Sequence, residues 1–174
     1  MAKTVGYMIT WTTYGTWLQG DEQGWVKEGI TYQAYPRIEE ANRKQMQHPA
    51  VRLTRGERDV VREAILGKAR ERKQKVCAIS VGANHVHIVL EYDACPISQV
   101  VQAYKNSATV SLKKNGLCCR VWTSGYDKRY CFDEESLRKR IEYVERHRKR
   151  TPEVKNFGYI EKKGPPKSRT SGAK

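Results

Sequence analysis

The chain has 174 residues and a mass of 20.1 kDa, the size of one domain with a single core. Its formal net charge is +14 at pH 7, from 33 Lys and Arg against 19 Asp and Glu. This charge favours a polyanionic partner, above all nucleic acid, although a basic protein of the ribosomal type would share it. No run approaches the ~20 apolar residues of a membrane span, and no signal-peptide pattern opens the sequence. We therefore expect a cytoplasmic protein without a membrane partner.

The first third of the chain is predicted to contain one strand, a long excursion and one helix. Residues 5–13 are rich in β-branched and aromatic side chains, which favours a strand. Residues 16–50 are irregular and punctuated by glycine, so we expect an excursion with a short hairpin near Trp25. Thr54 and Glu57 form a capping-box pattern, and apolar residues then recur at helical spacing, which predicts a helix.

The middle of the chain is predicted to form a hairpin followed by a second helix. Residues 76–81 and 85–92 are short apolar runs separated by Gly82-Ala83-Asn84, a spacing typical of paired strands. After Pro96, apolar residues repeat at intervals of three and four until Asn115-Gly116, where a helix is expected to stop.

The last third is predicted to contain a strand pair, a third helix and a tail. We expect residues 119–122 and 129–132 to pair with each other. Asp133 then caps a helix over 134–150, which has acidic residues in its first turn and an apolar stripe. Residues 151–174 are polar, basic and rich in proline, so we interpret them as a flexible tail.

The order of these elements predicts the fold. It reads βαββαβ with one extra C-terminal helix, which is the ferredoxin-like arrangement of the α+β class, an antiparallel sheet with helices packed on it. Residues 1–150 are expected to form this domain.

Two histidines stand out in the strand predicted at 85–92. Because His85 and His87 are separated by one residue, both imidazoles emerge on the same face of the sheet, near enough to share one divalent ion. Val86, Ile88 and Leu90 form the opposite, apolar face, which leaves the histidines on a face predicted to be open to a large ligand. A pair of this kind also arises by chance as exposed or hydrogen-bonded histidines, so its context decides.

The last predicted helix supplies that context. Tyr143 and His147 are four residues apart, so the phenol and the imidazole point into the same space. If His147 faces His85 and His87, three imidazoles converge on one ion and leave positions open for water and phosphate oxygens. His48, the remaining histidine, is expected on the excursion, and Tyr143 alone would be an ordinary amphipathic residue at the edge of a core.

These residues resemble a known family. Asn84-His85-Val86-His87 opens an apolar strand, Lys105 lies in the following helix, Trp122 precedes the last helix, and Tyr143 lies inside it. The pattern resembles the single-tyrosine HUH transposases, and within them the REP-associated tyrosine transposases, over roughly residues 5 to 150.

The resemblance implies both a reaction and a partner. In the family the histidine pair binds Mg²⁺ or Mn²⁺, the residue four after the tyrosine often completes the metal shell, and the tyrosine attacks single-stranded DNA beside a hairpin or palindromic repeat. It therefore implies His85, His87 and His147 as metal ligands and Tyr143 as the nucleophile that forms a 5′-phosphotyrosine link. DNA contacts are expected at Lys105, Trp122, Arg140, Arg146 and Arg148.

Two other functions are compatible with the sequence. One is a non-catalytic nucleic-acid-binding module on the same ferredoxin-like sheet. The other is a replication-initiation or relaxase-type nuclease, which shares the HUH site but is usually larger. The sequence leaves open whether the active unit is a monomer or a homodimer that exchanges its last helix. Since neither GxxxxGK[ST] nor GxGxxG occurs, no nucleotide cofactor is expected.

Overall fold

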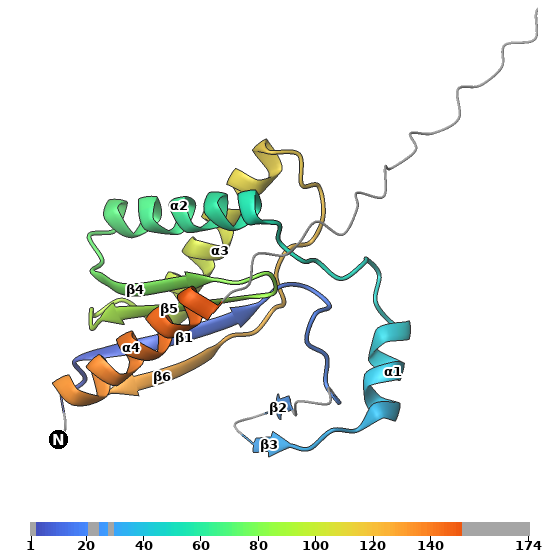
Figure 1. Ribbon diagram of the computed structural model, residues 1–174, viewed down its shortest axis with the longest axis horizontal. Coiled ribbons are helices and arrows are strands. Elements are labelled where there is room, and N and C mark those ends of the chain that lie inside the picture. Colours follow the sequence, from blue (N-terminus) through green and yellow to red (C-terminus); the bar gives the residue numbers. More distant parts are fainter. Residues whose placement is uncertain (1–2, 21–24, 28–29, 151–174) are drawn as a thin grey trace, which may run out of the picture.

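The computed structural model describes residues 3–20, 25–27 and 30–150, so the tail predicted at 151–174 lies outside the described residues. Its centre is a four-stranded antiparallel sheet in the order β4-β5-β1-β6 (Figure 1). The strands are β1 (Gly6–Thr12), β4 (Val76–Val81), β5 (His85–Glu91) and β6 (Asp127–Cys131).

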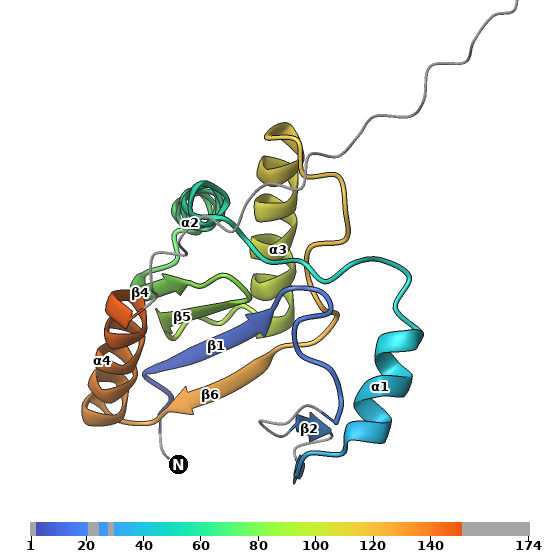
Figure 2. The same ribbon diagram turned by 45° about the vertical axis from the view of Figure 1, so that its right-hand side comes forward.

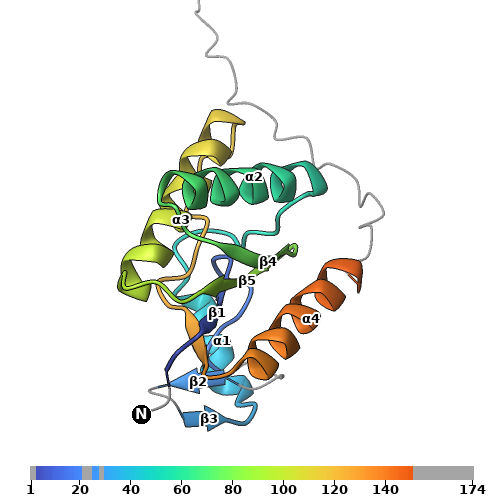
Figure 3. The ribbon, with the colours of Figure 1, turned by 90° about the vertical axis from the view of Figure 1, so that its left-hand side faces the viewer.

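Helices cover both faces of this sheet. On one face lie α2 (Arg55–Glu71) and α3 (Ile97–Lys114), and on the other lies α4 (Glu134–Arg150), as Figures 2 and 3 show. The chain therefore runs β1-α2-β4-β5-α3-β6-α4, which confirms the predicted βαββαβ order with an extra C-terminal helix. None of the described helices has the length and apolar character needed to cross a membrane.

The two faces carry separate apolar clusters, because successive residues of a strand point to opposite sides. Towards α2 and α3 the sheet presents a large buried cluster that includes Ile9, Trp11 and Ile88. Towards α4 it presents a smaller one, in which Leu137 and Val144 of the helix pack with strand residues. These are Met8, Ala78, Val89 and Cys131.

Capping residues mark the starts of α2 and α4. The capping box at Thr54 is present, since the Thr54 hydroxyl accepts from the Glu57 N–H and the Glu57 carboxylate accepts from the Thr54 N–H. At the start of α4, Oδ1 of Asp133 accepts the backbone N–H of Ser136 at 2.6 Å, as a capping aspartate does. Both helix starts confirm the sequence prediction.

A glycine lets α4 approach the sheet. A Cβ atom on Gly6 of β1 would lie 2.8 Å from Cδ1 of Leu137 and 2.7 Å from the carbonyl oxygen of Leu90. Any larger residue would therefore have to displace the Leu90 carbonyl group of β5 and the Leu137 side chain of α4. Glycine at this position therefore lets Leu137 of α4 pack directly on β1.

One predicted strand pair is wrong. β6 does not pair with residues 119–122 but with β1, from Gly6 opposite Cys131 to Thr10 opposite Asp127. Trp122 instead forms an isolated bridge with Thr13, just beyond the end of β1. Both segments therefore contact β1, Trp122 as a buried core residue and β6 as a strand whose residues are mostly exposed.

The excursion contains more structure than the sequence indicated. The hairpin near Trp25 is confirmed as β2 (Trp25–Lys27) paired with β3 (Ile30–Tyr32). The helix α1 (Pro36–Lys44) was not predicted, because it has no buried residue and so no apolar stripe to reveal it. It starts with proline in its first turn and carries the i,i+4 pairs Glu39–Arg43 and Glu40–Lys44.

Candidate active site

The HxH pair lies on the face of the sheet that α4 covers. In the antiparallel ladder, His87 is opposite Thr10 and His85 is opposite Thr12. The prediction that this face is open needs correction, because α4 packs on it and leaves only 7% of His87 exposed. The apolar stripe of α4 was recognised in the sequence, but nothing there indicated which face of the sheet it would cover.

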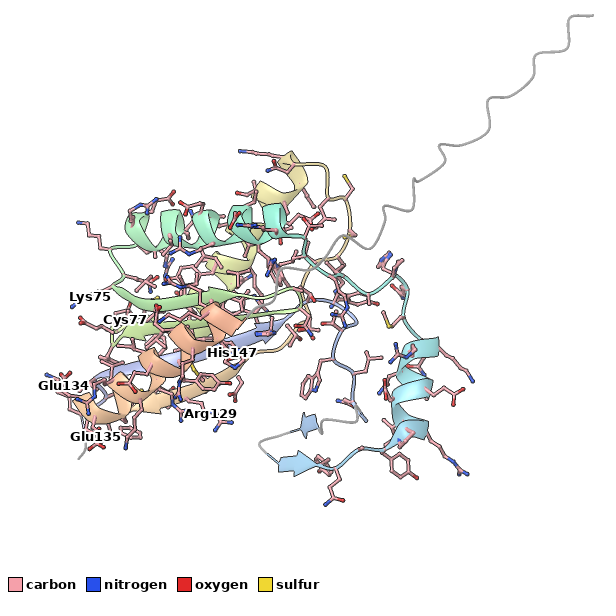
Figure 4. The ribbon with its side chains drawn as sticks, in the orientation of Figure 1. Lys75, Cys77, Arg129, Glu134, Glu135 and His147 are labelled. Carbon is pink, nitrogen blue, oxygen red and sulfur yellow. The ribbon has the colours of Figure 1, made fainter. Side chains whose placement is uncertain are left out.

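The same helix brings Tyr143 and His147 to the histidine pair. The ring centroid of His147 lies 5.7 Å from that of His85 and 4.9 Å from that of His87. The Tyr143 ring lies 4.7 Å from His147 and 5.7 Å from His87, with 38% of the residue exposed. The four side chains therefore meet within one chain, and Figure 4 shows His147 on the part of α4 that crosses the strands.

The three imidazoles fit a divalent metal ion. One nitrogen from each of His85, His87 and His147 can be chosen so that all lie within 4.8 Å of one another. Ligands on one ion with bonds of about 2.1 Å are at most about 4.2 Å apart, so small side-chain adjustments would complete the geometry. His48 is not in this group; its ring lies 6.2 Å from that of Tyr14.

Two neighbouring residues orient the histidine rings, and no sequence pattern indicated a role for one of them. The hydroxyl of Thr10 lies 2.7 Å from Nδ1 of His87, and Nδ1 of His85 donates to Oδ1 of Asn84 at 2.8 Å. Such contacts at Nδ1 leave Nε2 for a metal and fix the ring orientation. Thr10 was missed because it lies on a different strand, 77 residues away.

Burial keeps the histidine pair neutral. It lowers the pKa of His87 to about 3, with further contributions from His85 and His147, and it lowers the pKa of His85, together with the charge of His147. A neutral imidazole is the form that binds a metal, so near neutral pH a proton does not compete for these two ligands.

A further glycine shapes the site. A Cβ atom on Gly82, in the turn between β4 and β5, would lie 2.9 to 3.2 Å from the ring atoms of His85. The ring therefore packs directly on the glycine backbone, and a larger residue would displace it. The sequence showed Gly82 as a turn residue, but not its contact with the imidazole.

Lys105 and Trp122 lie together on the other side of the sheet from the histidines. They line a pocket of about 960 Å³ along α3, which Arg120, Lys113 and Tyr126 also line. The Lys105 ammonium donates to the carbonyl oxygens of Thr123 and Gly125, and the Trp122 indole N–H donates to the carbonyl oxygen of Lys105. The structure thus brings these two residues together but not to the histidines, and their contact with DNA stays a prediction.

The three arginines predicted to contact DNA lie at different positions along α4. Arg146 and Arg148 flank His147 in the sequence and are exposed, and Arg148 pairs with Glu145 at 3.1 Å. Arg140 lies nearer the start of the helix, where its charge acts to lower the pKa of Cys131 against the larger effect of burial. Arg146 and Arg148 therefore share the last turns of α4 with His147, and the contact of all three arginines with DNA stays a prediction.

Comparison with known proteins decides the family. The family described as "Transposase IS200 like" matches residues 44–147, a span that includes both histidines of the pair and extends to His147. The chain belongs to this family of transposases. No curated protein matches the transposase.

Two of the solved structures similar to this transposase are described as transposases. A REP-associated tyrosine transposase bound to a REP hairpin has 14% sequence identity and a TM-score of 0.49, over 82% of this chain and 65% of that one. The chain thus spans just under two thirds of that protein's length. A protein from Deinococcus radiodurans R1 described as a transposase has 16% identity and a TM-score of 0.42, over 84% of this chain and 93% of that one.

Proposed function

We propose that this transposase cleaves and rejoins single-stranded DNA through Tyr143, assisted by Mg²⁺ or Mn²⁺ on His85, His87 and His147. Its substrate would be a DNA hairpin or palindromic repeat of the REP type. The observation that carries the proposal is the meeting of one phenol and three imidazoles, from a strand and a helix far apart in sequence, within a single chain.

In the proposed reaction Tyr143 is the nucleophile. The Tyr143 oxygen attacks the phosphorus atom, the bond from phosphorus to the 3′-oxygen breaks, and the phenolic proton is released while the 3′-hydroxyl takes one up. The product is a 5′-phosphotyrosine, in which the phosphodiester energy is conserved for attack by another 3′-hydroxyl. A bound ion would polarise the phosphate and offset the charge that builds on its oxygens.

The residues of the chain have separate tasks in this scheme. The partial exposure of Tyr143 leaves it accessible to a DNA strand, and its ring lies against that of His147, one of the three residues that would hold the ion. His87, nearly buried and hydrogen-bonded to Thr10, forms the rigid part of the site. Arg146 and Arg148 extend the positive charge along α4, where phosphates flanking the scissile one would lie.

The test is covalent capture of a labelled single-stranded hairpin. Wild-type protein should form an adduct that survives denaturation, whereas Tyr143→Phe should form none and still bind the hairpin, because only one oxygen is lost. Tyr130→Phe, which alters an exposed tyrosine on β6, is the matched control and should react normally. An adduct that persists in Tyr143→Phe would assign the nucleophile elsewhere, although not to Tyr104, which is buried and donates to Gln74.

The metal role has its own test. His85→Ala should bind Mn²⁺ more weakly and should lose cleavage that added Mn²⁺ does not restore, while His48→Ala should behave as wild type. Unchanged cleavage in the presence of a chelator would reject the metal role. Hairpin binding without any adduct in the wild type would instead favour the non-catalytic nucleic-acid-binding module.

A further inference from the structure

A second cluster of basic side chains lies near the candidate active site, at the edge strand β4. A pocket of about 420 Å³ there is lined by Arg55, Arg58 and Arg62 of α2 and by Arg148 of α4. Asp59 is the one carboxylate among its lining residues. We call these four arginines the arginine pocket.

The position of the arginine pocket follows from the topology. β4 is the end strand in the order β4-β5-β1-β6, so its outer edge pairs with no other described strand. The helices α2 and α4 lie on opposite faces of the sheet and both pack against β4, as Figure 3 shows. Arg148 therefore joins the three arginines of α2 at this edge, from the other face.

The guanidinium groups of Arg58, Arg62 and Arg148 keep hydrogen-bond donors that their described contacts do not use. Nε of Arg58 is buried and has no hydrogen-bond partner among the described residues. Arg62 pairs with Glu63 at 3.2 Å and Arg148 with Glu145 at 3.1 Å, in contacts that use single guanidinium nitrogens and leave other N–H groups available. A buried donor of this kind normally has a partner, which here would be an anion or water.

Phosphate is the anion that this arrangement fits best. Guanidinium groups bind phosphate oxygens through two parallel hydrogen bonds, and several of them converge here around one concave site. Arg148 also follows His147 directly in the sequence, so the pocket and the candidate metal site share the last turns of α4. A DNA strand that crosses the metal site could continue along α4 to the β4 edge.

We propose that the arginine pocket binds backbone phosphates of the DNA strand that flank the scissile phosphate. This inference rests on the proposed function for its choice of ligand. The contacts read no base, so they position the strand without specifying its sequence. The pocket would thereby hold the substrate in register with Tyr143 across the edge of the sheet.

The test is binding of a fluorescent single-stranded DNA hairpin with single-stranded flanks, measured by anisotropy over a range of salt concentrations. A chelator is present, so that binding is measured without metal-assisted cleavage. Arg58→Gln is expected to weaken binding about tenfold, the effect of one lost charge-assisted hydrogen bond. It should also make the slope of log K against log salt less steep by about 0.7 per lost phosphate contact.

The matched control is Arg70→Gln, which removes the same charge from an exposed position in the last turn of α2. It should leave affinity and slope close to those of the wild type. Arg62→Gln, at a pocket position where 38% of the side chain is exposed, should weaken binding in the same direction as Arg58→Gln and serves as the second variant if Arg58→Gln unfolds. Thermal melting identifies such unfolding.

The outcomes separate this inference from the proposed function. Equal losses of DNA affinity in Arg58→Gln and Arg70→Gln would mean that only net charge matters. Wild-type affinity in both Arg58→Gln and Arg62→Gln would mean that no strand enters the pocket. Each of these results would overturn the inference. Failure of the proposed function would appear instead as a missing tyrosine adduct, which leaves the binding comparison intact.

Discussion

The hydroxyl oxygen of Thr10 on β1 lies 2.7 Å from Nδ1 of His87, on the neighbouring strand β5. This contact ties the most buried ligand of the candidate metal site to the other inner strand of the sheet. With Nδ1 bonded in this way, Nε2 is the nitrogen left for an ion. Thr10 therefore acts as a positioning residue for His87.

Replacing Thr10 with valine should weaken metal binding. Loss of such an outer hydrogen bond typically lowers metal affinity about 10- to 100-fold. The shape of the side chain is kept, so the strand should still pair normally. Titration with Mn²⁺ measures the change, and Thr10→Ser, which keeps the hydroxyl, should retain most of the wild-type affinity. Equal affinity in Thr10→Val and wild type would show that the ring needs no support from β1.

Replacing Gly82 with alanine should displace the His85 ring. The new Cβ would lie 2.9 Å from a ring atom of His85, closer than non-bonded carbon atoms approach. The ring can move more easily than the backbone, so the expected result is weaker Mn²⁺ binding with little change in the unfolding temperature. Gly56→Ala is the control, because nothing lies within 4 Å of its Cβ position. A normal metal affinity in Gly82→Ala would mean that His85 does not need its present position.

The sequence predicted those features that depend on local periodicity. The i,i+2 spacing of His85 and His87 placed both on one face, and the i,i+4 spacing of Tyr143 and His147 joined them on one helix. The helix starts at Thr54 and Asp133 were predictable because a cap involves residues three apart.

The features that the sequence did not predict depend on tertiary contacts. β6 pairs with β1 rather than with residues 119–122, which are closer to it in the chain, and this pairing joins segments more than 100 residues apart. α4 covers the histidine face because Leu137 and Val144 pack with Met8 and Val89 on that face. The arginine pocket joins two helices on opposite faces, which no spacing along the chain reveals.

Because of Lys105, the stability of the fold should change with pH in the alkaline range. Burial lowers the pKa of its ammonium to about 8, below the ordinary value of an unfolded lysine. Between pH 8 and about 10.4 the unfolded chain therefore binds more protons than the folded one, so this group adds stability as pH rises through that window. Below pH 8 the cost of burying the charge is fully present.

Urea unfolding of wild type and Lys105→Met at several pH values tests this dependence. Lys105→Met loses the two bonds to Thr123 and Gly125 at every pH, which lowers its stability by a constant amount. The stability of the wild type relative to the variant should nevertheless rise from pH 8 to 10, since the tyrosines that also titrate are common to both. A difference that stays flat or shrinks would mean that the two carbonyls hold the proton on Lys105.

The types of ligand atom in the candidate site predict which ion binds more tightly. The candidate ligands are three imidazole nitrogens, without a carboxylate in the group. Mg²⁺ binds oxygen ligands and gives up water reluctantly, whereas imidazole suits transition metals. Of the two ions expected, Mn²⁺ should therefore bind more tightly than Mg²⁺, as calorimetric titration of the DNA-free protein can measure.

Replacing His147 with aspartate would test the reason for this preference. The new carboxylate supplies an oxygen from the helix side, so the ratio of Mn²⁺ to Mg²⁺ affinity should fall while His85 and His87 remain in place. His48→Asp adds the same charge outside the ligand group and should leave the ratio unchanged. If His147→Asp and His48→Asp shift the ratio equally, the added negative charge alone is responsible, and His147 is not a ligand.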